Sequence, residues 1–240
     1  MRLTPRDITD MQQQEEEIVT NDYVFRPSLH INNDLSTSPG KAAMYPKAAS
    51  LCLPLLTDPK NGIKTMGNVG ARVDIISSYL AQRNPSVSFV SVDFQSNLVE
   101  LNSLLPQSDN WSFMSGYALD LFEQGKLQGD LVLFSSTSVL FTNKELRLYF
   151  NALSKSTKYS ILNEGWWPAA KSPTFFRVIK PEEIDPHNSL IILGPYDNYL
   201  HNYPAILSEY GFEIVSSEIG EVPNRFYWCL QIVAKNRAIA

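Results

Sequence analysis

A group of small residues is the first place where this sequence could hold a ligand. Gly67, Asn68 and Gly70 follow a short apolar run and precede a segment with the pattern of a helix. Glycine lets the backbone turn tightly and approach a bound molecule, and the start of the next helix offers free amides. A Gly-x-x-Gly sequence by itself is more often an ordinary turn, so its interpretation depends on the residues at the ends of the other strands.

A carboxylate, Asp93, ends the next apolar run. At the end of the second strand of a nucleotide-binding sheet, an acidic side chain can accept hydrogen bonds from both hydroxyls of a ribose. The third and fourth runs also end in short polar stretches, at 116–120 and 134–137. Ligands of parallel sheets bind beyond the carboxyl ends of the strands, so we expect these four stretches to lie around one site.

A long aromatic segment, from about residue 165 to 203, supplies a third group of candidates. Aromatic side chains with polar ends suit the wall of a pocket for an uncharged or cationic organic molecule. The alternative is that the aromatic residues pack a β-hairpin formed by 175–179 and 190–193. Together with one residue of the N-terminal region, the candidate substrate-binding residues are Trp166, Tyr196, Tyr203 and Tyr23.

Strands and helices alternate from residue 61 onward, which predicts crossover units and a parallel sheet. The loop around Pro223 is too short for a parallel crossover, so the last strand should run antiparallel to its neighbour. The predicted strands are 62–67, 87–93, 111–117, 130–135, 159–164, 212–217 and 226–233. The predicted helices between the first five are 72–83, 95–105 and 144–154, with a short helical turn at 119–125.

The chain divides near residue 60. Residues 1–60 predict an N-terminal helical extension or lid, with helices that begin near Thr4 and Pro46 and a loop over 32–40. Residues 61–240 predict one α/β domain with a substrate-loop insertion at about 165–203.

The strand-end motifs, taken in order, resemble those of the class I (Rossmann-like) S-adenosylmethionine-dependent methyltransferases. The resemblance covers roughly residue 61 to the C-terminus and rests on 66–70, 92–98, 116–121 and 130–137, together with the reversed last strand. It implies a doubly wound α/β fold, with helices on both faces of a mostly parallel seven-stranded sheet. The implied strand order is 3-2-1-4-5-7-6 with strand 7 antiparallel. It also implies S-adenosylmethionine as the cofactor and no metal.

The resemblance implies a role for each strand end. The small residues would line the methionine part of the cofactor, and the carboxylate would bind the ribose hydroxyls. The next aromatic residue would pack against the adenine, the end of the third strand would flank the adenine edge, and the end of the fourth would lie below the sulfonium. In that order, these residues are Gly67, Asn68 and Gly70; Asp93; Phe94; Tyr117 and Ala118; and Ser135 and Ser136.

Methyl transfer is an in-line displacement, so the enzyme mainly has to align acceptor, methyl group and sulfur. A hydroxyl acceptor must also lose a proton, and His201 is the candidate base, with Asp197 to orient it. A lone histidine is more often structural, but His201 lies within the aromatic segment. The expected reaction is methylation of a hydroxyl or an amine of a small-molecule metabolite.

The composition argues against several other classes of partner. The net charge is −5, and the Lys and Arg residues are scattered, so no basic surface for nucleic acid is expected. The chain has no apolar run of about 18 residues to cross a membrane, and its polar first 17 residues are unlike a signal peptide. These features predict a cytoplasmic protein with a small-molecule substrate; a homodimer stays open. The two cysteines, Cys52 and Cys229, are expected as buried thiols.

Two other functions stay open. Thr65 stands where the family usually has an acidic residue two positions before the first glycine, and Val69 stands where a middle glycine is expected. These departures favour, as the alternative, a non-catalytic methyltransferase-like binding or assembly module. A nucleotide-binding oxidoreductase is disfavoured, because a complete Gly-x-Gly-x-x-Gly sequence is missing and the last strand is reversed.

Overall fold

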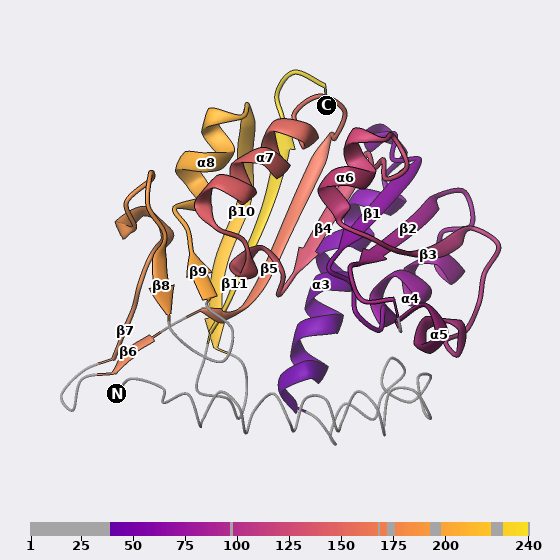
Figure 1. The fold of residues 1–240 in the computed structure, drawn as a ribbon, viewed down its shortest axis with the longest axis horizontal. Coiled ribbons are helices and arrows are strands. Elements are labelled where there is room, and N and C mark those ends of the chain that lie inside the picture. The colour runs from indigo at the N-terminus through magenta and orange to yellow at the C-terminus, as the bar shows by residue number, and fades with distance from the viewer. Residues whose placement is uncertain are drawn as a thin grey trace.

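A seven-stranded sheet runs through the molecule (Figure 1). The computed structural model describes residues 39–96, 98–167, 169–171, 176–192, 198–221 and 228–239. The strand order is β10-β11-β5-β4-β1-β2-β3; β1 to β5 are parallel, and β11 is antiparallel to both of its neighbours. This confirms the predicted order. The strands are β1 Thr65–Val69, β2 Ser88–Asp93, β3 Trp111–Ser115, β4 Leu131–Ser135, β5 Tyr159–Trp167, β10 Phe212–Glu221 and β11 Trp228–Asn236.

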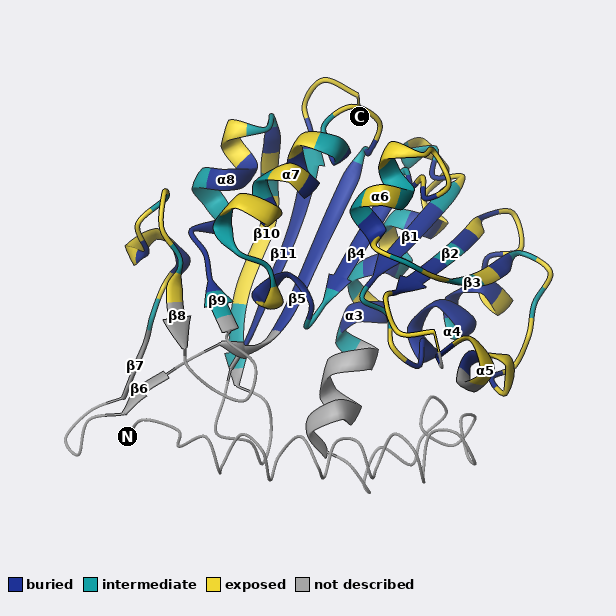
Figure 2. Cartoon of the chain, viewed as in Figure 1, coloured by how far each residue is buried: buried dark blue, intermediate teal, exposed yellow. Residues whose placement is uncertain are grey.

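Helices cover both faces of the sheet, and each face has its own apolar core. The central strand β4 is buried from Leu131 to Phe134, as expected for a parallel strand covered on two sides (Figure 2). On one face lie α3 Pro39–Thr57, α4 Ile75–Arg83 and α5 Leu98–Ser103. On the other lie α6 Ala118–Glu123, α7 Asn143–Leu153 and α8 Tyr203–Glu209.

Short elements complete the fold. The segment after β5 forms two hairpins, β6 Ala169–Lys171 with β7 Phe176–Val178, and β8 Leu190–Ile192 with β9 Asn198–Leu200. The predicted pairing of 175–179 with 190–193 was therefore wrong in its partners. The 3₁₀ helices within the described ranges are η2 Pro59–Asn61, η3 Ser138–Leu140 and η4 Pro181–Glu183.

The first strand begins later than predicted, and this changes which residues form the turn after it. Asp58 caps η2, and Gly62 ends it with φ +58°, so the backbone becomes extended only at Thr65. Gly67 and Asn68 consequently lie inside β1, where they pair with Val90 and Ser91. The prediction that they form the turn was wrong, because the turn begins at Gly70.

The helix predicted to begin near Pro46 begins at Pro39 and continues through Pro46. Both cysteines are buried free thiols, as predicted. Within the part of the chain that is described, no helix is both long and apolar enough to cross a membrane.

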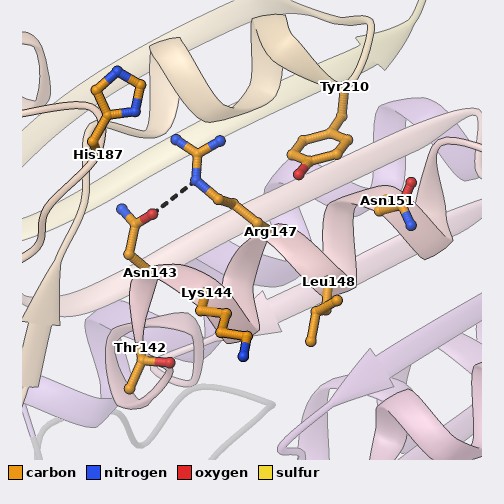
Figure 3. Close-up of a pocket in the computed structure, with 8 residues that line it drawn as sticks. All are labelled: Thr142, Asn143, Lys144, Arg147, Leu148, Asn151, His187 and Tyr210. Carbon is orange, nitrogen blue, oxygen red and sulfur yellow. Dashed lines mark hydrogen bonds between the residues drawn. The ribbon is translucent and has the colours of Figure 1, made fainter.

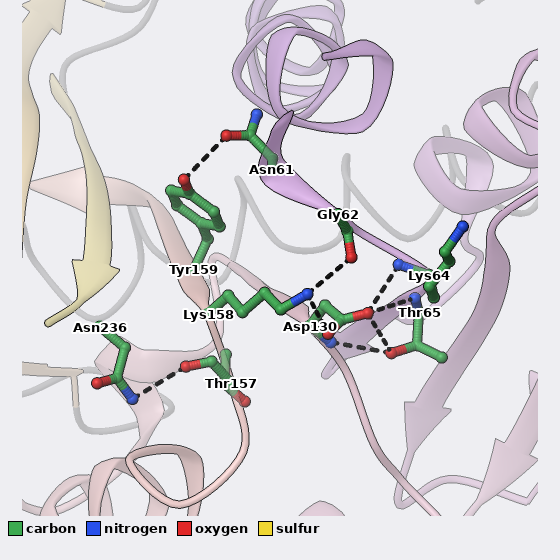
Figure 4. A network of polar contacts seen from close by, with 9 residues as sticks. All are labelled: Asn61, Gly62, Lys64, Thr65, Asp130, Thr157, Lys158, Tyr159 and Asn236. Carbon is green, nitrogen blue, oxygen red and sulfur yellow. Dashed lines mark hydrogen bonds and ion pairs between the residues drawn. The ribbon is translucent and has the colours of Figure 1, made fainter. Parts of the chain in front are cut away.

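The amino edge of the sheet is tied together by Asp130, just before β4 (Figure 4). Its Oδ2 accepts hydrogen bonds from the amides of Lys64 (2.7 Å) and Thr65 (3.1 Å), and its Oδ1 lies 3.2 Å from Lys158 Nζ. Partial burial opposes ionisation, but the Lys64 amide and Lys158 together lower the pKa of Asp130. This carboxylate therefore joins β4 to the start of β1.

We expect Asp130→Asn to lower the free energy of unfolding by about 1–2 kcal/mol at pH 7, because the charge-assisted bonds are lost. The folded-state pKa is depressed, so this stabilisation is present above the unfolded pKa of about 3.9 and disappears as the pH falls through the folded value. Urea denaturation at pH 7 and pH 3 measures the change. Asp109→Asn, at an exposed position, is the control. An equal loss for Asp130→Asn at both pH values would contradict an electrostatic origin.

Candidate functional site

The turn from β1 to α4 lies at the carboxyl edge of the sheet, against the end of β2. The amides of Gly70 and Ala71 donate to Val92 O at 2.9 and 3.0 Å, and the amide of Arg72 donates to Asp93 Oδ2 at 3.1 Å. Gly70 has φ +67° and Arg72 has φ +50°, so both adopt the left-handed conformation. The turn therefore uses its first three amides internally.

A buried carboxylate, Asp74, holds this turn from beneath. Its Oδ1 accepts the amide of Ser77 at 2.8 Å and caps α4, while its Oδ2 accepts the hydroxyl of Ser91 in β2. Asn102 of α5 accepts the Asp74 amide at 2.8 Å and donates to Arg72 O at 2.7 Å. Burial raises the pKa of Asp74, and the hydrogen bonds oppose that rise. Strand, turn and two helices are thus fixed to one another.

Asp93 ends β2 and is only 5% exposed. One carboxylate oxygen accepts the Arg72 amide, and the other accepts the amide of Gln95 at 3.1 Å. A carboxylate offers about four lone-pair positions, so each oxygen keeps a further one for a ligand. Its orientation is fixed before any ligand arrives.

Two exposed aromatic side chains follow β2 and β3 at this edge. Phe94 is 61% exposed and Tyr117 is 70% exposed, and their rings lie nearly parallel, with centroids 6.3 Å apart and planes 14° apart. Gly116, with φ +155°, donates its amide to Asp93 O at 2.9 Å, which holds the two strand ends together. Water-exposed stacked rings form a platform on which a flat heterocycle can stack.

The turn after β4 packs against the turn after β1. Ser136 has φ +54°, and Thr137 Oγ1 donates to Gly70 O at 3.2 Å. A Cβ atom at position 70 would overlap the Thr137 side chain, so this contact requires glycine. The ends of β1 and β4 are therefore closed against each other.

Glu164 of β5 orders the turn after β4 from within the core. It is fully buried, and its Oε1 accepts the amide (3.2 Å) and the hydroxyl (2.7 Å) of Ser138. Ser138 Oγ also lies 2.7 Å from Tyr203 Oη. Burial raises the pKa of Glu164 to about 7, although Ser138 and the amides of Thr137 and Val139 favour its ionised form.

His201 lies in the same buried region and does not face solvent. Its Nδ1 is 3.1 Å from Ser189 Oγ, its ring packs edge-on against Tyr203, and its Nε2 has no hydrogen-bond partner among the described residues. Burial lowers the pKa of His201 to about 4, so it is neutral near pH 7. The expectations of a base at a pocket wall, and of Tyr203 as a wall residue, are not met in this structure, because both side chains belong to the core.

Some of the remaining predicted site residues lie at strand or helix ends, one is buried within a strand, and others fall outside the described residues. Ala118 is the buried first residue of α6, and Ser135 is the partly buried last residue of β4. Asn68 is buried in β1. Trp166 lies in β5, but its side chain, and the whole of Tyr23, Tyr196 and Asp197, fall outside the described residues.

A polar row on the α3 face of the sheet was not predicted from the sequence. Asn163 Nδ2 donates to Ser135 Oγ at 3.1 Å, and Gln231 Nε2 donates to Asn163 Oδ1 at 2.9 Å, across β4, β5 and β11. The Nζ of Lys47 in α3 lies beside Gly220, where a Cβ atom would be 3.1 Å away. Strand alternation puts these residues on one face, but only the strand register brings them into one row.

A separate surface hollow of about 600 Å³ lies over α7 and near α8 (Figure 3). Arg147 is already engaged there: it donates to Asn143 Oδ1 at 2.8 Å and to Pro186 O at 2.7 Å, and it pairs with Glu209. The hollow is lined by helix surfaces rather than by the strand ends, and we assign it no role. Its lining residues are Thr142, Asn143, Lys144, Arg147, Leu148, Asn151, His187 and Tyr210.

Comparison with known proteins gives matches at the level of structure. No family model and no curated protein sequence matches this chain. Magnesium protoporphyrin IX methyltransferase of Synechocystis, solved with S-adenosylmethionine, is 15% identical over 98% of each chain, with a TM-score of 0.56. A 1,6-didemethyltoxoflavin N1-methyltransferase of Burkholderia thailandensis, solved with S-adenosylhomocysteine, is 13% identical over 98% of this chain and 92% of its own, with a TM-score of 0.59.

A putative S-adenosylmethionine-dependent methyltransferase of Listeria monocytogenes is 14% identical over 80% of this chain and 99% of its own, with a TM-score of 0.58. At these identities the likeness concerns the fold. The chain has the class I methyltransferase fold, as the strand order also indicates.

We expect Glu164→Gln to remove a pH dependence of stability. The pKa of Glu164 is about 7 when folded against 4.5 for the free side chain, so ionisation costs the folded state about 3 kcal/mol by an order-of-magnitude conversion. Because the folded pKa is raised, this group makes the wild type less stable as the pH rises from about 4.5 through 7.

The measurement is the free energy of unfolding in urea from pH 4 to 8. The difference between wild type and Glu164→Gln should change across that window. His201 has the opposite effect on stability, because its lowered pKa makes the folded state less stable as the pH falls. Both proteins carry His201, so its effect cancels in the difference between them. Glu100→Gln, at an exposed position, is the control. Parallel curves for wild type and Glu164→Gln would contradict the burial argument.

We expect Gly70→Ala to destabilise the protein by more than the cost of a left-handed alanine. Gly211 has φ +82° and open space around it, so Gly211→Ala measures that cost alone, about 1 kcal/mol. Gly70→Ala should add about 1–3 kcal/mol from overlap with Thr137. Thermal denaturation of both variants, and of Gly70→Ala combined with Thr137→Gly, tests this. If the double variant is no more stable than Gly70→Ala alone, overlap with the Thr137 side chain is not the cause of the lost stability.

Proposed function

We propose that this chain is an S-adenosylmethionine-dependent methyltransferase that acts on a small molecule. The observation that carries the proposal is the exposed pair of Phe94 and Tyr117 beside the fixed carboxylate of Asp93, at the carboxyl edge of the sheet. The structures of similar fold from Synechocystis and Burkholderia contain S-adenosylmethionine and S-adenosylhomocysteine, respectively, which supports the choice of ligand.

The residues at this edge fit the adenosine part of the cofactor. Phe94 and Tyr117 offer flat apolar faces for the adenine, and the remaining lone pairs of Asp93 can accept the two ribose hydroxyls. The amides of residues 70, 71 and 72 are already engaged. These three amides are therefore not available to a charged group of the cofactor, and side chains at this edge are the better candidates to bind it.

The bound cofactor would supply a methyl group activated by a sulfonium. The protein then has to align the acceptor with that methyl group and to exclude water. A rigid site favours this alignment. The turns after β1 and β4 touch through Thr137 and Gly70, and Asp74 and Glu164 hold them from below. Ser135 ends β4, and Ser136 lies on the turn that follows it.

The acceptor side of the proposal rests on the polar row of Ser135, Asn163 and Gln231. Buried amides on a sheet face are costly unless hydrogen-bonded, and here Ser135, Asn163 and Gln231 are hydrogen-bonded in a row across three strands. Asn163 and Gln231 are themselves buried, so Ser135, half-buried at the end of β4, is the member of the row that an acceptor with polar groups can contact. His201 is covered and neutral, so we favour a neutral amine acceptor, which needs alignment but no strong base.

The alternative is a non-catalytic module that binds a ligand or a partner at the same edge. Two observations favour it: the turn amides are engaged, and Arg72 occupies a left-handed position inside the glycine-type turn. The two functions differ in whether the edge binds the adenosine part of the cofactor with useful affinity.

We expect the purified protein to bind S-adenosylhomocysteine with micromolar affinity in a calorimeter, and Tyr117→Ala to weaken this binding about tenfold. Loss of one aromatic stacking partner costs about 1–3 kcal/mol, and an exposed side chain can be removed without unfolding the protein. Leu148→Ala, an exposed apolar residue of α7, is the matched control and should leave binding unchanged. Absence of binding by the wild type would reject the methyltransferase and favour the non-catalytic module.

A further inference from the structure

Arg72 puts a positive charge, without an ion-pair partner among the described residues, at the edge where we propose that the cofactor binds. Its side chain is exposed. Its amide lies 3.1 Å from Asp93 Oδ2, the group proposed to bind the ribose. A guanidinium on this residue is therefore within reach of whatever extends from the ribose.

The backbone of Arg72 is held on both sides. The amide donates to Asp93, and the carbonyl accepts a hydrogen bond from Asn102 Nδ2 at 2.7 Å. The residue has φ +50°, a conformation that glycine adopts without strain. A strained non-glycine conformation persists only where the surroundings impose it, and it is concentrated at functional sites. The structure thus fixes where this side chain leaves the turn.

Most backbone amides of the turn are already hydrogen-bonded within the protein. The amides of Gly70 and Ala71 are bonded to Val92, that of Arg72 to Asp93, and that of Asp74 to Asn102. Asp93 and Asp74 are the acidic groups within this network, and both are buried with their oxygens facing hydrogen-bond donors. The guanidinium is therefore the positively charged group that the turn offers to an anion among the described residues.

We propose that Arg72 binds the α-carboxylate of the aminoacyl end of the cofactor; this inference rests on the proposed function. With the adenine on Phe94 and Tyr117 and the ribose on Asp93, an aminoacyl end that extends from the ribose over the adjoining turn would come beside Arg72. A guanidinium binds a carboxylate in a bidentate, charge-assisted manner. It repels the sulfonium, so it favours the orientation in which the carboxylate, and not the sulfur, lies beside it.

The test compares two ligands that differ in the aminoacyl end. S-adenosylhomocysteine carries the carboxylate, whereas 5′-methylthioadenosine keeps adenine, ribose and a neutral sulfur but lacks it. Both are titrated calorimetrically into the wild type, Arg72→Ala and Arg72→Lys, with thermal denaturation to verify folding. Arg83→Ala removes the same charge at the far end of α4, where Arg83 stacks on Tyr79, and is the matched control.

We expect Arg72→Ala to raise the dissociation constant of S-adenosylhomocysteine about 10- to 100-fold, the range of a charge-assisted hydrogen bond. The dissociation constant of 5′-methylthioadenosine should change by no more than about twofold. Arg72→Lys should fall between, because it keeps the charge but not the planar fork. Equal weakening of both ligands, or no weakening of either, overturns the inference while the proposed function stands. Binding of neither ligand to the wild type overturns the proposed function and this inference together.

Discussion

The buried carboxylate of Asp74 is the interaction on which the candidate site depends. It caps α4 through the Ser77 amide and accepts the hydroxyl of Ser91, which in turn accepts the indole N–H of Trp111 at 2.8 Å. Strands β2 and β3 and the first crossover helix therefore share one polar network inside an otherwise apolar core. A buried carboxyl is tolerated only when it is hydrogen-bonded, so the network fixes the start of α4 and, with it, the turn above.

A second buried carboxylate, Glu164, fixes the turn after β4, on the other side of β1. Glu164 of β5 holds Ser138, and the turn after β4 then carries Thr137 onto Gly70. The two turns meet through a contact that only glycine permits, so a displacement of either would move the other. At the amino edge of the sheet, Asp130 and Lys158 form an ion pair. The exposed aromatic side chains of the candidate site project instead from the carboxyl edge.

The sequence was sufficient to predict the order of the sheet and the ends of β2 and β4, because these followed from local pattern. Alternation of strands and helices indicated the parallel order, and the short loop near Pro223 indicated the reversed last strand. The site was predicted only in part. Gly62 looked like the start of a strand but caps η2, so the turn was placed three residues early and Arg72 and Asp74 were missed. The partners of Glu164 and the burial of His201 arise from contacts between segments far apart in the chain, which periodicity cannot reveal.

Backbone strain is also concentrated at the carboxyl edge of the sheet, an observation that does not depend on the similar structures. Among the described residues, two that are not glycine have a left-handed backbone, Arg72 and Ser136, and they lie on the two turns that meet at Gly70. Glycine would form both turns at lower energy, so turn geometry does not account for the arginine and the serine. These positions add a guanidinium and a hydroxyl, on either side of a contact that the core keeps rigid. Strained residues of this kind are concentrated at functional sites, and Asp93 with its aromatic neighbours occupies the adjoining strand end, so the strain supports the proposal that a ligand binds at this edge.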